Sequence, residues 1–161
     1  MDALLADLAR RFRFNENVLA AATGGFAAED WSSAPGAQGG NTPHWILGHL
    51  ASTRRYLARR LGVDLLEEPW EALFGMRSKP AGTRGYPPPE ALVQDFASTG
   101  ERMCARLAEL SPAQAGEDWG GSFPDGSRTL AGAAGFLHFH ESYHLGQLGL
   151  ARRLRGHPGF A

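Results

Sequence analysis

Two histidines near the end of the chain have the spacing of a metal-binding pair. His140 and His144 lie four residues apart in the segment LHFHESYHLGQL, so on a helix their side chains project from one face, one turn apart. Two imidazoles placed in this way can bind one divalent ion. A pair of hydrogen-bonded core histidines would have the same spacing, so at this point both interpretations stay open.

A complete site needs a further ligand, because zinc and similar ions take three or four protein ligands. His49 is the first choice, since it lies well inside a second apolar segment, whereas His44 stands at the start of that segment and is the fallback. His138 is two residues from His140 and would point to nearly the opposite side of the helix. His157 follows the last helix, in the tail.

Other polar residues close to these histidines could support chemistry. Glu141 would point about 100° away from His140, which favours a supporting or surface role over that of a general base. Gln147 is three residues past His144 and could accept a hydrogen bond from its ring. Tyr56 and Tyr143 could donate hydrogen bonds to a substrate, although a tyrosine in the core is the more common case.

Four long helices are expected to position these residues. Apolar residues at helical spacing, with capping and stop signals, predict helices over about 2–23, 43–61, 90–110 and 129–154. Shorter helical stretches are predicted at 67–74 and just after Ser111, which opens a capping-box pattern. No alternating strand pattern is visible. The sequence therefore predicts an all-α four-helix bundle with long connecting loops, as a single domain over residues 1–161.

The predicted loops, 24–41, 62–88 and 116–128, are longer than bundle connections usually are. They are rich in aromatic residues, which are unusual in disordered segments, and we expect these side chains to pack over one end of the bundle. The residues concerned are Trp31, Trp70, Phe74, Tyr86, Trp119 and Phe123.

Composition limits the classes of partner. The chain has 161 residues, 43% of them hydrophobic, and a formal net charge of −1, which argues against a nucleic-acid partner. A cluster of arginines (Arg54, Arg55, Arg59 and Arg60) is expected on a solvated helix face. The single cysteine, Cys104, is expected to be a buried, inert thiol. The start of the chain lacks the pattern of a secretion signal, and no apolar run is long enough to span a membrane, so we expect a cytoplasmic protein without membrane contact.

Two segments resemble the DinB/YfiT-like family of four-helix-bundle proteins, which are thought to be metalloenzymes. They are TPHWILGHLASTRRYL and HFHESYHLGQLGLARRLRG. The family pattern has one histidine in a GHL-like segment of the second helix and an HxxxHxGQ segment in the last, and His49, His140 and His144 occupy these positions. Each motif is short, but their order and separation make the resemblance specific, and it covers nearly the whole chain.

The resemblance implies that His49, His140 and His144 bind a divalent ion, with zinc or nickel expected first and manganese or iron next. It also implies a homodimer packed through helices. Characterised relatives include metal-dependent transferases of low-molecular-weight thiols such as bacillithiol or mycothiol. We therefore expect a metal-dependent transferase or hydrolase with a small-molecule substrate. The alternatives are a non-catalytic protein that binds a metal or small ligand, and a dimeric bundle that the ion merely stabilises.

Overall fold

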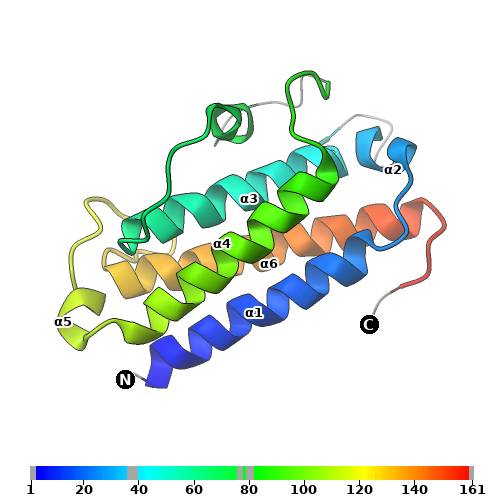
Figure 1. The fold of residues 1–161 in the computed structure, drawn as a ribbon. Coiled ribbons are helices and arrows are strands. Elements are labelled where there is room, and N and C mark those ends of the chain that lie inside the picture. Colours follow the sequence, from blue (N-terminus) through cyan, green and yellow to red (C-terminus); the bar gives the residue numbers. More distant parts are fainter. Residues whose placement is uncertain (1–2, 36–39, 76–77, 79–81, 160–161) are drawn as a thin grey trace.

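Four long helices form the body of the protein in the computed structural model, which describes residues 3–35, 40–75, 78 and 82–159. They are α1 (Ala3–Thr23), α3 (Pro43–Arg60), α4 (Pro89–Glu109) and α6 (Leu130–Leu154), and they pack side by side (Figure 1). The described residues form no strand, so the predicted all-α bundle is confirmed. Among them, no helix is both long and apolar enough to cross a membrane.

Local signals account for where the site-bearing helices begin. The Oγ1 atom of Thr42 accepts a hydrogen bond from the Trp45 N–H at 3.2 Å, ahead of a proline in the first turn of α3. Thr129 does the same for α6, accepting from the Gly132 N–H at 3.1 Å. Gly62 follows α3 with a φ of 86°, a conformation that glycine adopts without strain. Because these caps fix where each helix begins, they also fix how far along its helix each histidine lies.

Within the part of the chain that the structure describes, three short helices interrupt the connections between the long ones. The 3-10 helix η1 (Pro69–Phe74) and the single turn α5 (Pro112–Ala115) match the predicted short stretches, and Ser111 forms the expected capping box with Gln114. The helix α2 (Ala28–Ser32) was not predicted. A helix of five residues is too short to show apolar periodicity, and the Asp30 carboxylate that accepts the Ala27 N–H at 2.8 Å is its main local support.

The buried apolar residues fall into two clusters, one toward each end of the bundle. On every long helix a polar or glycine position separates the two clusters, so a buried polar layer crosses the middle of the bundle. The layer contains Asn15 of α1, Arg54 of α3, Thr99 and Gly100 of α4, and Glu141 of α6, and the half-buried Glu16 of α1 lies at its edge.

Arg54 joins all four long helices within this layer, and its side chain is only 1% exposed. Its guanidinium donates two hydrogen bonds to the Glu141 carboxylate, at 2.7 and 2.9 Å, and one to Glu16 at 2.7 Å. It also donates to the backbone carbonyls of Phe12 at 2.8 Å and Phe96 at 3.1 Å. One side chain of α3 is thereby bonded to α1, α4 and α6.

The expectation that the arginine cluster lies on a solvated face was therefore wrong for its first two members. Arg55 is also buried, and it donates to Glu71 at 2.8 Å and Asp95 at 2.6 Å. Arg59 is half-buried, and only Arg60 of the cluster is exposed. The charge pattern of one helix does not reveal carboxylates that other helices bring to it, and these partners are what make the burial of a guanidinium tolerable.

The aromatic loop residues do not gather over one end of the bundle, as was expected. The Trp31 and Tyr86 rings pack against His44, at the beginning of α3, with ring centroids 6.3 and 5.2 Å away. The Trp119 ring packs against Tyr56, near the other end of α3, at 5.7 Å. The loops therefore cover two separate regions, because the connection before α4 and the one before α6 reach α3 from opposite ends.

Replacing Arg54 by methionine tests the importance of the polar layer, because it removes the charge and keeps most of the volume. Glu141 is then a buried carboxylate without its cation, so we expect R54M to lower the free energy of unfolding by about 3–5 kcal/mol. Urea denaturation of the metal-free protein measures this. The matched control is R11M at the exposed Asp7–Arg11 pair, which should cost less than about 1 kcal/mol. Similar small losses in both variants would contradict the assignment.

Candidate metal centre

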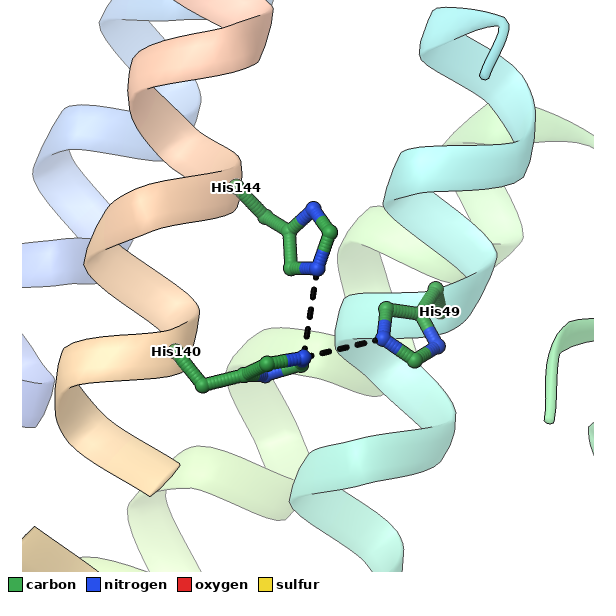
Figure 2. Close-up of side chains that lie close together, drawn as sticks. All are labelled: His49, His140 and His144. Carbon is green, nitrogen blue, oxygen red and sulfur yellow. Dashed lines mark hydrogen bonds between the residues drawn. The ribbon is translucent and has the colours of Figure 1, made fainter. Parts of the chain in front are cut away.

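The structure brings together the three histidines that were predicted as ligands. His140 and His144 project from α6 toward His49 of α3, and Figure 2 shows the three rings converging. The Nε2 atom of His140 lies 3.2 Å from the Nε2 atoms of both His49 and His144. Ligand nitrogens of a tetrahedral zinc ion lie roughly 3.3 Å apart, because each Zn–N bond is about 2.0–2.1 Å. The spacing of the nitrogens therefore suits a shared divalent ion.

The hydrogen-bond partners of His49 and His144 indicate where their protons are. The Nδ1 atom of His49 is 2.7 Å from the carbonyl oxygen of Phe74, and that of His144 is 2.8 Å from Oε1 of Gln147. Both oxygens can only accept, so each Nδ1 carries the hydrogen and each neutral ring has its lone pair on Nε2. Two lone pairs therefore point toward the centre of the group.

Neither neutral tautomer of His140 satisfies both of its ring nitrogens. Its Nε2 faces two other imidazoles, and its buried Nδ1 has no hydrogen-bond partner among the described residues. A proton on Nε2 could serve only one neighbour, and a proton on Nδ1 would be a buried donor without an acceptor, which is unfavourable. A cation at the centre would accept the Nε2 lone pair of all three rings and so remove the conflict at Nε2 of His140, although the His140 proton on Nδ1 would still lack an acceptor among the described residues. These residues therefore fit a divalent metal ion.

Burial keeps the three imidazoles in the neutral form that metal ligands need. It lowers the pKa of His140 to about 4, helped by the charges that His144 and His49 would carry if protonated. Burial also lowers the pKa of His144 to about 4, although the hydrogen bond with Gln147 opposes the shift. The pKa of His49 is lowered for the same reason, with the Phe74 carbonyl opposing. At neutral pH no proton has to leave before an ion can bind.

Gly48 and Phe74 fix His49 in a way that the sequence did not reveal. A Cβ atom on Gly48 would lie 2.3 Å from the Phe74 ring, so glycine is required for η1 to approach α3 this closely. That approach brings the Phe74 carbonyl to the His49 ring. The Trp45 ring stacks on the same imidazole, with centroids 4.9 Å apart and an angle of 13° between the planes. The His49 ring is therefore held from two sides.

The remaining histidines lie outside the group. The Nε2 atom of His44 contacts the Pro87 carbonyl at 2.8 Å, so the fallback ligand is occupied elsewhere. His138 packs edge-on against Phe12 of α1, with centroids 5.1 Å apart, on the side of α6 away from the site, as was expected. His157 pairs with Asp30 at 3.0 Å and ties the tail to α2.

Of the four polar residues that the sequence placed near the histidines, Gln147 alone forms a hydrogen bond with one of them among the interactions described. Gln147 accepts the predicted hydrogen bond from His144. Glu141 is 2% exposed and bonded to Arg54, so it has a structural role in the polar layer and is no surface residue. Tyr56 and Tyr143 are 44% and 57% exposed, so the interpretation of either as a core tyrosine was wrong.

Comparison with known families agrees with this architecture. The family model described as the DinB superfamily matches residues 11–148. The chain belongs to the DinB superfamily. The matched segment carries all three histidines of the candidate centre. No curated protein matches the chain. Membership in the DinB superfamily and the three converging histidines are both compatible with metal binding.

Loss of a ligand should abolish tight metal binding. We expect protein purified without a histidine tag to take up about one Zn²⁺ or Ni²⁺ ion per chain. H49A and H144A should each weaken that binding by about a hundredfold or more, because even loss of a ligand's hydrogen-bond partner costs about 10–100-fold. Competition with a chromophoric chelator gives the affinities. H44A and H138A are the matched controls and should bind as the parent does; equal losses in all four variants would refute the assignment.

The lowered pKa values make the metal-free protein sensitive to acid. The folded pKa of His140 and His144 is about 4, against an ordinary value of 6.5, so between these values the unfolded chain binds protons that the folded protein does not. Stability is therefore highest above about pH 6.5 and falls toward pH 4. Urea denaturation with a chelator present should show this fall between pH 7 and 5. The H140L/H144L double variant should show a smaller one, and an identical pH dependence would contradict the burial argument.

Proposed function

We propose that the chain is a metal-dependent enzyme, a transferase or a hydrolase, that acts on a small substrate. The observation that carries the proposal is a group of three imidazole ligands to which the described residues add no fourth protein ligand. Structural zinc sites normally use four protein ligands, whereas catalytic sites use three and keep one position open. When bound, a divalent ion supplies Lewis-acid catalysis, lowering the pKa of a thiol or water or polarising a carbonyl.

The polar layer argues against a purely structural role for the ion. Arg54 already ties the four long helices together through Glu141, Glu16 and two backbone carbonyls. None of these contacts involves the three histidines. A bundle held in this way does not need an ion for its assembly, so an ion bound by the histidines is free to serve a substrate.

Transfer of a low-molecular-weight thiol is the first reaction to test. The thiol of Cys104 is fully buried, and burial raises its pKa to about 11, so the protein's own cysteine is a poor nucleophile. In a thiol-transfer reaction the substrate must therefore provide the thiol. The chain's contribution is to hold the ion through three neutral rings, with Gln147 and the Phe74 carbonyl keeping two of those rings oriented.

The donor set supports an order of preference among metals. Imidazole suits zinc, nickel and iron, whereas manganese and magnesium favour carboxylate and carbonyl oxygens. The candidate group offers three imidazole nitrogens as ligands and no carboxylate oxygen. We therefore propose zinc or nickel as the bound ion, with iron next and manganese last.

A conjugation assay distinguishes an enzyme from a binding protein. We expect the metal-loaded protein to accelerate conjugation of at least one cellular thiol to monochlorobimane, measured by fluorescence with several thiols in parallel. A chelator or the H49A substitution should return the rate to that of the uncatalysed reaction, and H138A should not. Stoichiometric metal binding without turnover of any thiol would reject thiol transfer and favour the non-catalytic alternative.

A further inference from the structure

A series of aromatic rings runs from the end of α3, across the connection before α6, to α6 itself. The Tyr56 ring contacts the Trp119 ring at 5.7 Å, and the Trp119 ring contacts the Phe123 ring at 5.5 Å. Phe123 then contacts Phe136 at 4.9 Å, and Phe136 contacts Phe139 at 6.2 Å, all measured between centroids. In Figure 1 this connection is the yellow segment beside the neighbouring ends of α3 and α6.

The aromatic series borders the candidate metal centre. Phe136 stands one turn before His140 on α6, and Tyr56 stands about two turns beyond His49 on α3. The Tyr143 ring lies 5.2 Å from the His144 ring. Phe139 is 63% exposed, and Tyr143, one turn further along α6, is 57% exposed. Exposed apolar side chains clustered beside a site indicate a binding surface.

A hollow opens between this connection and α6. It is lined by Pro124, Asp125, Gly135, Phe136 and Phe139, with a volume of about 420 Å³, which lies in the usual range for small-molecule pockets. A Cβ atom placed on Gly135 would meet nothing within 4 Å. The glycine therefore leaves open space that any larger side chain at this position would fill.

The wall of the hollow is held by the protein itself. The Trp119 N–H donates to the Arg128 carbonyl at 2.7 Å, and the Phe123 N–H donates to the Ser127 carbonyl at 2.9 Å. Arg60 of α3 donates to the Trp119 carbonyl at 2.5 Å, which anchors the connection to the bundle. A wall formed in this way can receive a ligand without first being ordered, and that saves binding energy.

The charge in the hollow indicates what kind of ligand fits. Asp125 is the only ionisable residue among those that line it, and its carboxylate accepts hydrogen bonds from Ser127, from N–H at 2.9 Å and from Oγ at 2.8 Å. The other lining residues are apolar or glycine. An anionic group would be repelled by the carboxylate, whereas an uncharged ring would meet the two phenylalanine rings.

We infer that this hollow binds the flat, uncharged, apolar part of a small substrate whose reacting group extends to the three histidines. The inference that the reacting group reaches the histidines rests on the proposed function, whereas the inference that the ring binds in the hollow does not. A second copy of the chain is a poorer occupant, because stable protein interfaces bury about 800 Å² on each partner, far more than a hollow lined by five residues offers.

Filling the hollow tests the inference in the metal-free protein. The neutral fluorescent probe N-phenyl-1-naphthylamine should bind the parent, and G135L should weaken its binding by about tenfold or more, a change equivalent to about 1.4 kcal/mol. Leucine favours helix over glycine, so the variant should fold. G146L, also on α6 with open space around its Cβ position, is the matched control and should bind as the parent does. Equal affinity in all three proteins would overturn the inference.

A second measurement links the hollow to the histidines. In cobalt-loaded protein, the visible spectrum of the ion should report benzyl mercaptan binding about tenfold tighter than ethanethiol, and G135L should remove that preference. Equal affinities would overturn the inference while leaving metal-dependent thiol binding intact. Failure of both thiols to bind, with the fluorescent probe still bound, would reject the proposed function and support the hollow as a separate binding site.

Light scattering on the same proteins tests the competing occupant. The parent, G135L and G146L should have the same oligomeric state, because the inference places a small molecule in the hollow. If G135L separates a dimer into monomers while probe binding is unchanged, a second copy covers this surface and the inference fails.

Discussion

Arg54 brings a full positive charge into the middle of the bundle, where solvent barely reaches it. A buried guanidinium is tolerable only when its donors are bonded and its charge is balanced, and here that requires groups from α1, α4 and α6 together. The requirement sets how the four helices align. It also determines which side of α6 faces the core, because Glu141 must reach Arg54. His140 precedes Glu141 and so points about 100° away, toward His49 of α3.

Features that depend on neighbouring residues could be predicted from the sequence, whereas features that depend on distant ones could not. The long helices follow from apolar spacing and from caps such as Thr42 and Thr129. The burial of Arg54 could not be foreseen, because Glu141 is 87 positions away in the chain. The pairing of His140 with His144 was visible as a spacing, and His49 joined them by its depth in the second helix and by its place in the family pattern.

Some of the contacts that orient the histidine rings come from residues outside the two histidine motifs. The carbonyl of Phe74 sets the protonated nitrogen of His49, and it reaches that ring only because Gly48 lacks a side chain. A backbone carbonyl carries no signature in a sequence, so the position of η1 was needed to find it. Membership in the DinB superfamily agrees with the bundle and the histidines, but a shared fold does not determine a reaction.

The separation of the Arg54 contacts from the three histidines has an evolutionary consequence. A Cβ on Gly100 would lie 2.0 Å from the Arg54 guanidinium, so the residues of the polar layer can change only in concert. The histidines carry no such constraint, since Arg54 and its partners bind none of them. A descendant of this chain could therefore lose its ligands one at a time and still fold, keeping the bundle as a scaffold for new chemistry. Inheritance in such a lineage would preserve Arg54 and Glu141 longer than the three histidines of the candidate metal centre.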